Sequence, residues 1–457
     1  MATGPQPFPT VPPPLAPERP VAWPRRTVRT LSNGLRIVLV ESHTIPRISI
    51  ELIFRSGNAA ALHIRPGLAE ITAAVVRTGT ASRTGPQIEE WLRRMGAELS
   101  TSAGADSTAI ALSGLAEFAE GLLELADDLA RNASFPPEEF ERERRQMLEE
   151  LRIQRTTPAF LAAERLRRVL FGAHPYGIAA PAESDVAAYR REELEQFYRE
   201  HYVAGDAVLL AVGDFSTDRL LEFIEQRFGA WPAQQPPGLP SAQPPECRGR
   251  RVYLVDLPGA VQAQLLVGNR AITRPHPDWL RLAVANAIYG GAFHSRLVMN
   301  LREQKGYTYS PRSSVHALRE HGYLAIGAAV RNEVVAASLA EIFCEVDRLR
   351  ALPVAEEELT EIQQYLCGVF ALGLATQEGL LNQLATVYLH DLPEEYLETY
   401  RERVRAVRRD DVLAAARRYF DSPNMQIVLV GDRTAVAEPA ALFGEVEFYD
   451  AQGNRTE

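Results

Sequence analysis

The chain has 457 residues, too many for one hydrophobic core, so its length predicts about two to four domains. A formal net charge of -10 argues against a nucleic-acid partner, because phosphate binding requires a basic face. The three cysteines, Cys247, Cys344 and Cys367, are odd in number and lack paired metal-ligand spacing. They exclude a disulfide framework and a zinc-finger-type site, and they suit a reducing compartment.

The beginning of the chain, residues 1–24, is rich in proline and has no hydrophobic periodicity, which predicts an extended tail. It shows no basic segment followed by an apolar stretch, so we expect no signal peptide. The longest apolar runs, such as residues 207–212, fall far short of the ~20 residues that a membrane span requires. We therefore expect a cytoplasmic protein with no membrane association.

Two segments of similar pattern, residues 25–230 and 249–450, lie on either side of a second proline-rich stretch, residues 231–248, which we interpret as a linker. Each segment begins with two β-branched strands, continues through amphipathic helices and ends with a buried strand. The predicted strands are residues 36–40, 48–54 and 208–214 in the first segment and 251–256, 262–267 and 427–432 in the second. Amphipathic helices are predicted over residues 118–129 and 337–349.

The positions of these elements indicate an internal duplication. Gly213 and Gly431, each followed by aspartate at the end of a predicted strand, are 218 positions apart. The charged helix starts at Pro137 and Glu356 have nearly the same separation, which is too long for a solenoid repeat. The sequence thus predicts an α+β fold of two homologous domains, each a mostly antiparallel sheet packed with helices, with residues 451–457 as a short tail.

Short strings in both segments resemble the pitrilysin/insulinase family of zinc peptidases, the inverzincins, over about residues 25–450. The strings, in chain order, are Leu31-Ser-Asn-Gly-Leu-Arg36, Arg55-Ser-Gly57, Gly67-Leu-Ala69, His174-Pro-Tyr-Gly177, Gly290-Gly-Ala-Phe-His-Ser-Arg-Leu297 and Leu301-Arg-Glu-Gln-Lys-Gly-Tyr-Thr-Tyr-Ser310. One such string is weak evidence, but six in the family's order are strong evidence. The resemblance implies two insulinase-like domains.

The zinc motif of this family is missing here. In active members the helix after Gly-Leu-Ala carries H-x-x-E-H, whose histidines bind zinc and whose glutamate activates water. The matching positions are Glu70, Ala73 and Ala74. A methyl group supplies no lone pair at the ~2.0–2.2 Å that zinc ligands require, and Glu70 offers only one oxygen ligand. We expect no metal and no cofactor in this chain.

Two later glutamates, Glu143 and Glu150, match the family's remaining carboxylates, one a zinc ligand and the other its support. They are seven residues apart and share one helix face. Without the motif helix we expect a vestigial or structural role. Acidic residues are also common on any helix rich in glutamate and arginine, so the alternative is that Glu143 and Glu150 are ordinary residues of such a helix.

The second segment retains the family's other functional pair. Arg302 and Tyr309 match the residues that, by resemblance, bind the substrate backbone and donate a hydrogen bond to the oxyanion of the tetrahedral intermediate. An arginine and a tyrosine seven residues apart often occur by chance, but residues 295–310 match the family's string in register. Tyr307, the other tyrosine near this position, fits the family pattern less well. Ser100 and Ser102 lie in a stretch that matches the family's substrate-pairing strand, with Ser100 where the family has asparagine. An ordinary hairpin is the alternative for that stretch.

In this family the zinc half and the Arg/Tyr half face each other across a chamber, and in some members two chains divide these roles. The resemblance implies a subunit that is inactive alone and pairs with a homologous zinc-bearing chain as a heterodimer. It would bind peptide substrates through Arg302 and Tyr309. The alternative is an insulinase-like scaffold without proteolytic activity. The nine histidines are scattered in the sequence, so we expect surface or hydrogen-bonded histidines rather than a substitute metal site.

Overall fold

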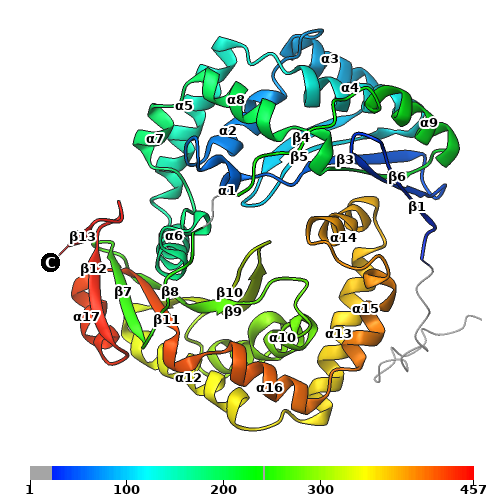
Figure 1. Ribbon diagram of the computed structural model, residues 1–457. Coiled ribbons are helices and arrows are strands. Elements are labelled where there is room, and N and C mark those ends of the chain that lie inside the picture. Colours follow the sequence, from blue (N-terminus) through cyan, green and yellow to red (C-terminus); the bar gives the residue numbers. More distant parts are fainter. Residues whose placement is uncertain (1–22, 240–241, 457) are drawn as a thin grey trace, which may run out of the picture.

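The computed structural model describes residues 23–239 and 242–456, which form two α+β domains facing each other, the upper and lower halves of Figure 1. The first sheet has the order β1-β2-β6-β3-β5-β4. Only the β2–β6 pair is parallel. Its strands are β1 (Arg26–Thr30), β2 (Arg36–Glu41), β3 (Arg47–Phe54), β4 (Glu98–Ala103), β5 (Thr108–Leu115) and β6 (Ala207–Gly213).

The second sheet repeats this plan. Its order is β13-β12-β7-β11-β8-β10-β9, in which β7-β11-β8-β10-β9 corresponds to β2-β6-β3-β5-β4. Two pairs, β7 with β11 and β7 with β12, are parallel. Its strands are β7 (Arg251–Asp256), β8 (Gln262–Ala271), β9 (Arg312–Ala317), β10 (Gly322–Arg331), β11 (Gln426–Gly431), β12 (Glu445–Tyr449) and β13 (Arg455–Thr456). The predicted duplication and mostly antiparallel sheets are confirmed.

Helices cover the outer face of each sheet. The first domain contains α1 (Asn58–Ala61), α2 (Leu68–Val76), α3 (Gly85–Met95), α4 (Ala119–Asn132), α5 (Pro137–Gln154), α6 (Pro158–Phe171), α7 (Glu183–Ala187), α8 (Arg191–His201) and α9 (Thr217–Phe228). The second contains α10 (Trp279–Asn286), α11 (Arg296–Val298), α12 (Val335–Ala351), α13 (Glu356–Gly373), α14 (Gln377–Leu389), α15 (Tyr396–Arg405), α16 (Arg409–Tyr419) and α17 (Arg433–Ala441). Two π-helical turns, η4 (Ala287–Gly291) and η5 (Met299–Gln304), flank α11.

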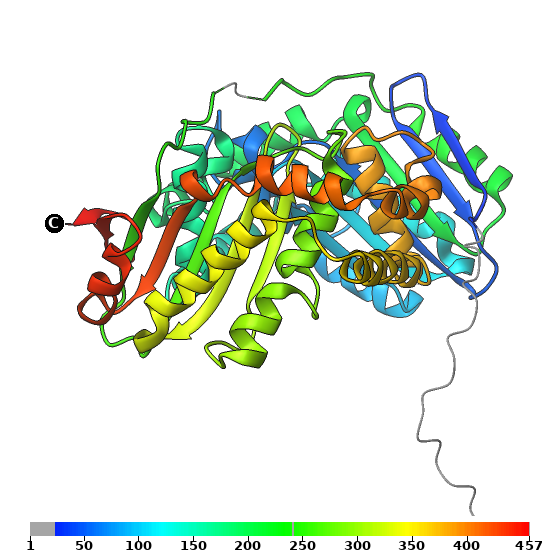
Figure 2. The ribbon, with the colours of Figure 1, turned by 90° about the horizontal axis from the view of Figure 1, so that it is seen from below.

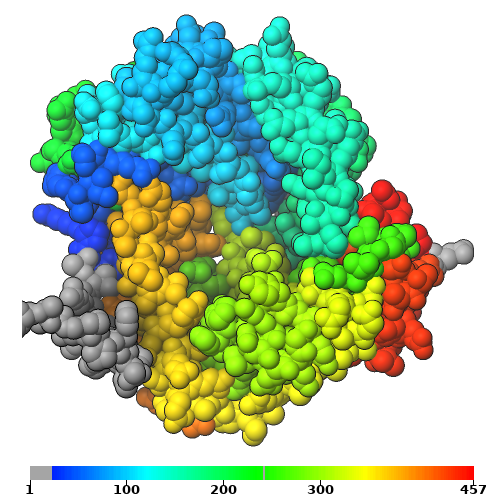
Figure 3. All heavy atoms as spheres, turned by 180° about the vertical axis from the view of Figure 1, so that it is seen from behind, coloured from blue at the N-terminus to red at the C-terminus, as the bar shows by residue number. Residues whose placement is uncertain are grey.

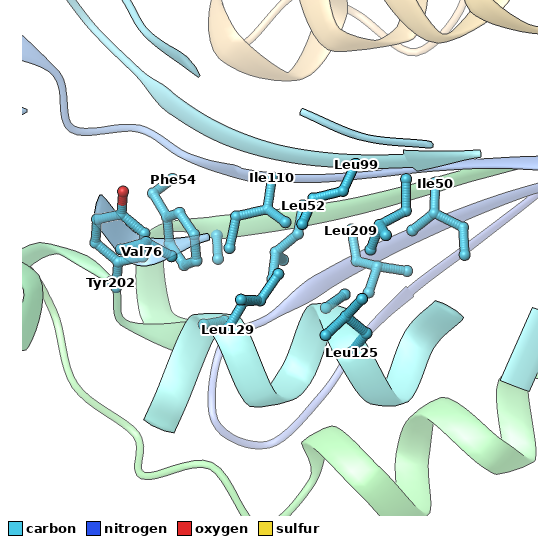
Figure 4. Close-up of a cluster of buried hydrophobic side chains, with 14 of the residues drawn as sticks. Ile50, Leu52, Phe54, Val76, Leu99, Ile110, Leu125, Leu129, Tyr202 and Leu209 are labelled. Carbon is cyan, nitrogen blue, oxygen red and sulfur yellow. The ribbon is translucent and has the colours of Figure 1, made fainter. Parts of the chain in front are cut away.

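Strands β6 and β11 are buried at every position because both faces of each sheet are covered. On β6, Leu209 and Ala211 join the core under the outer helices, whereas Val208 and Leu210 join a separate core on the inner face. Figure 4 shows the outer core, where Leu129 of α4 lies beneath the side chains of the sheet.

The inner faces are covered by a reciprocal exchange of helices between the domains. Helix α6 of the first domain packs on the second sheet, where Leu166 and Leu170 join the core of Val428 on β11. Helix α14 of the second domain packs on the first sheet, where Leu384 joins the core of Val208. Figure 1 shows both helices between the sheets. The exchange holds the two domains together through two buried contacts rather than through the linker alone.

The connecting and terminal segments differ in how they pack. Residues 231–239 and 242–248 contain neither helix nor strand, and both stretches run along one side of the molecule (Figure 2). Trp231 is nevertheless buried, and its carbonyl accepts a hydrogen bond from Asn33. Within residues 451–456, predicted as part of a short tail, a turn between Asp450 and Asn454 lets β13 pair with β12. Residues 1–22 of the predicted N-terminal tail lie outside the described residues.

Candidate functional site

Helix α2 carries the positions that match the zinc motif, and Gly67 sets where it begins. Gly67 has φ 74°, and a Cβ atom there would lie 2.6 Å from the hydroxyl of Tyr189. Only glycine fits both the left-handed backbone and this close approach. The Tyr189 hydroxyl donates to the carbonyl of Pro66 at 2.5 Å, which fixes the turn before the helix.

Glu70, Ala73 and Ala74 lie on one side of α2, as their spacing of three and four residues requires. Ala73 is only 2% exposed, whereas Ala74 is half-buried and lines a cavity of about 580 Å³ together with Thr101 and Glu143. At both alanine positions the side chain is a methyl group, which offers neither a metal ligand nor a general base.

Glu143 already has a positively charged partner. Arg142 contacts the Glu143 carboxylate at 2.9 Å and that of Glu139 at 2.5 Å. Burial raises the pKa of Glu143, and the charge of Arg142 opposes that rise. A guanidinium therefore supplies the counter-charge in this cavity.

Glu70 and Glu150 interact with each other electrostatically. Burial, and to a smaller extent the charge of Glu150, raises the pKa of Glu70. Glu70 remains accessible to water because it lines a second cavity of about 210 Å³ with Arg167 and Tyr176, among others. Glu150 accepts a hydrogen bond from Gln146 at 2.8 Å. Within residues 23–239 and 242–456, the carboxylates of Glu70, Glu143 and Glu150 do not converge as a metal-binding group.

Arg302 and Tyr309 lie together on the second domain. Arg302 is in η5, and its guanidinium carbon is 4.5 Å from the centre of the Tyr309 ring and 5.0 Å from that of Phe293. Tyr309 lies in the loop before β9 and is 79% exposed. The arginine thus lies close to two exposed aromatic rings, an arrangement that cation–π attraction favours.

Tyr307, the alternative considered for this pair, is placed differently. It is partly buried and packs against the core of the second domain. Its backbone N–H donates to the carbonyl of Leu301 at 2.9 Å. Of the two tyrosines in this loop, Tyr309 is therefore the one whose phenol is more accessible to a bound molecule.

Strand β4 is one of the two edge strands of the first sheet, and strand addition by a peptide requires such a position. Ser100 and Ser102 are exposed and lie on the face opposite to the buried Leu99. Thr101, which the sequence analysis did not single out, is on the side of the cavity at Ala74 and Glu143. The two serines thus lie on the face away from that cavity.

One cluster of possible metal ligands was not expected. His63, Glu200 and His201 each direct one ligand atom into a common space, and these atoms all lie within 4.8 Å of one another. Burial and the nearby His63 lower the pKa of His201 to about 4. Glu200 and His201 are adjacent in sequence but far from His63, so no spacing in the sequence indicated this group.

Family models match both domains. The model described as Insulinase (Peptidase family M16) matches residues 36–180, and the model described as Peptidase M16 inactive domain matches residues 188–366. Among curated proteins, the chain is 24% identical over 358 residues to the uncharacterized zinc protease YmxG of Bacillus subtilis, covering 78% of this chain and 86% of that one. An uncharacterized zinc protease of Mycobacterium bovis is 26% identical over 412 residues, covering 86% and 90%.

Solved structures share the whole architecture. A peptidase M16 inactive domain from Pseudomonas fluorescens superimposes with a TM-score of 0.84 at 25% identity, covering 90% of this chain and 99% of that one. A protease from Helicobacter pylori has a TM-score of 0.82 at 19% identity, covering 89% and 100%. The periplasmic protease PqqL of Escherichia coli has a TM-score of 0.75 at 17% identity, covering 92% of this chain and 46% of that one. In the described part of the chain, no helix has the length and apolar character of a membrane span.

Proposed function

Because the chain belongs to the insulinase family of M16 peptidases, we propose that it is the zinc-free subunit of a two-chain peptidase. In this proposal, Arg302 and Tyr309 complete an active site whose zinc is held by a homologous partner subunit. The observation that carries the proposal is the exposed phenol of Tyr309, held beside the guanidinium of Arg302. A large aromatic side chain with this exposure is available to a substrate or a partner.

The need for a partner follows from what α2 lacks. Hydrolysis of a peptide bond in this family requires a metal-activated water, and Ala73 and Ala74 supply neither ligand nor base. The positive charge of Arg142 lies beside Glu143 and disfavours the binding of a cation there. The catalytic zinc is accordingly assigned to the partner subunit rather than to α2 of this chain.

The chemistry assigned to this chain is substrate binding and stabilisation of charge. A neutral phenol such as Tyr309 donates a hydrogen bond to the developing oxyanion, and such a donor contributes about 2.7–4 kcal/mol to transition-state stabilisation. The guanidinium of Arg302 offers donors to substrate carbonyls. The edge strand β4, with Ser100 and Ser102, offers a backbone edge to an extended peptide. The molecular face in Figure 3 is hollowed between the two domains, which leaves room for such a segment.

The experiment is affinity purification of the tagged chain from its native host, followed by reconstitution with the co-purified protein. We expect a stoichiometric partner of similar size that carries an intact H-x-x-E-H motif, and peptide cleavage by the mixture but by neither chain alone. Recovery of the chain alone, or cleavage that is independent of it, contradicts the proposal. That result favours the alternative, an insulinase-like scaffold.

A further inference from the structure

The exposed His63, the half-buried Glu200 and the buried His201 converge outside the region that corresponds to the family's zinc motif. His63 follows α1 in the turn that leads to α2, while Glu200 and His201 are the last two residues of α8. The His63 Nε2 atom is 3.1 Å from Oε2 of Glu200, and Nε2 of His201 is 4.0 Å from the same oxygen. The three ligand atoms, all within 4.8 Å of one another, are therefore close enough together to share one ion.

Each histidine is oriented by its other ring nitrogen. Nδ1 of His63 is 2.7 Å from the carbonyl of Ala60, a distance at which it donates a hydrogen bond, and in the neutral ring this leaves Nε2 as the lone-pair nitrogen. Nδ1 of His201 is 3.1 Å from the hydroxyl of Ser56. Support of one ring nitrogen by a backbone carbonyl or another polar group is the usual arrangement of metal-binding histidines.

The buried nitrogen of His201 lacks a partner of its own. His201 is 2% exposed, and its Nε2 has no hydrogen-bond partner among the described residues. A hydrogen bond between His63 and Glu200 alone accounts for two of the three groups and leaves this nitrogen unsatisfied, which is costly in a buried position. A cation bound at the centre satisfies all three.

We propose that His63, Glu200 and His201 bind one divalent transition-metal ion of the zinc class. Two imidazole nitrogens and one carboxylate oxygen are a donor set that zinc accepts. Ligands about 2.1 Å from a tetrahedral ion lie about 3.4 Å apart, so the observed 3.1 and 4.0 Å require only small side-chain shifts. The partly exposed His63 and Glu200 leave a fourth position for water.

The bound ion ties the turn before α2 to the end of α8. Glu200 is itself held, since its other oxygen accepts a hydrogen bond from Gln196 at 3.0 Å. The ion therefore links two elements of the first domain, and the site is independent of the proposed partner and of Tyr309. Binding to the folded state raises the melting temperature of the isolated chain.

The test uses the full chain, with any purification tag removed and metal stripped by a chelator. Zn²⁺ is titrated by calorimetry, and Co²⁺ is added as a spectroscopic probe. We expect one equivalent of Zn²⁺, tetrahedral Co²⁺ absorption bands and a rise in Tm of about 3 °C at saturation. His201→Ala should weaken Zn²⁺ binding at least about tenfold.

Two further variants keep the test decisive if His201→Ala does not fold. His63→Ala and Glu200→Gln remove partly exposed ligands and should weaken binding to a similar extent. The matched control is His43→Ala, because His43 is also exposed and close to carboxylates, but its two nitrogens contact Asp214 and Glu41 separately. Absence of stoichiometric binding, or unchanged affinity in His63→Ala and Glu200→Gln, overturns the proposal and assigns a buried water to this space.

Discussion

The guanidinium of Arg302 lies over the ring of Tyr309, with 4.5 Å between the guanidinium carbon and the ring centre. The two residues come from η5 and from the loop before β9, and the ring of Phe293 also lies near the same guanidinium. Contacts of this kind contribute about 0.5–1 kcal/mol at exposed sites. Tyr309 is thereby kept beside a cation at the surface without being buried.

This relationship leads to a prediction for Tyr309→Phe. The variant retains the ring over Arg302 and should assemble normally, but it removes the phenolic donor. In the reconstituted two-chain complex, we expect kcat to fall by about 10²- to 10³-fold, as for loss of one oxyanion donor. Steady-state peptide cleavage and size-exclusion chromatography of the complex measure the two properties.

Tyr307→Phe is the matched control for that substitution. It makes the same chemical change two residues away, at a side chain that packs against the core. We expect kcat to stay within about twofold of the wild-type value. A Tyr309→Phe complex that cleaves at the wild-type rate, or equal losses in both variants, contradicts the assigned role of Tyr309.

The two alanines of the degenerate motif should differ in their tolerance of polar side chains. Ala73 is buried, so Ala73→Gln is expected to lower the free energy of unfolding by about 2–3 kcal/mol. Ala74 lines the cavity, so Ala74→Gln should cost less than about 1 kcal/mol. Urea unfolding followed by circular dichroism measures both values, and equal losses would show that the cavity does not accommodate position 74.

Glu70 should make stability depend on pH. Its pKa is raised in the folded state, so folding favours the protonated form. The contribution of Glu70 to stability is fully present below the unfolded-state pKa and is lost as pH rises through the folded-state pKa. Glu70→Gln should therefore be more stable than wild type near pH 7, and this advantage should vanish as pH falls below about 4.3.

Urea unfolding at a series of pH values measures this difference. Glu117→Gln serves as the control because it makes the same chemical change at an exposed glutamate. An advantage of Glu70→Gln that is constant across the pH range would contradict the electrostatic origin. Glu150→Gln should reduce the pH dependence, because the charge of Glu150 contributes to the raised pKa.

The helix exchange should contribute strongly to stability. Leu384 of α14 is fully buried on the inner face of the first sheet, so Leu384→Ala is expected to lower the free energy of unfolding by about 2–5 kcal/mol. Leu166→Ala on α6 should have a similar effect at the other sheet. The exposed Leu442 is the control, with a change within about 0.5 kcal/mol. Thermal and urea unfolding test this, and a Leu384→Ala variant as stable as Leu442→Ala would contradict it.

Local patterns in the sequence predicted much of the fold. The strand at residues 251–256 and the helix starts at Pro137 and Glu356 agree with β7, α5 and α13. The strand predicted over residues 262–267 continues to Ala271 in β8, where it pairs with β10. These features follow from periodicity and from residues near one another in the chain, so the sequence carries them directly.

The sequence by itself determined that the domain is duplicated and that methyl groups stand at Ala73 and Ala74, because both are properties of residue order and side-chain chemistry. Only the tertiary structure decided that α6 and α14 cross to the opposite sheets and that Tyr309 rather than Tyr307 is exposed. The same holds for the convergence of His63 with Glu200 and His201. The physical reason is that contacts between distant segments depend on how whole helices and sheets pack. Residues that this packing brings together show no regular spacing along the chain.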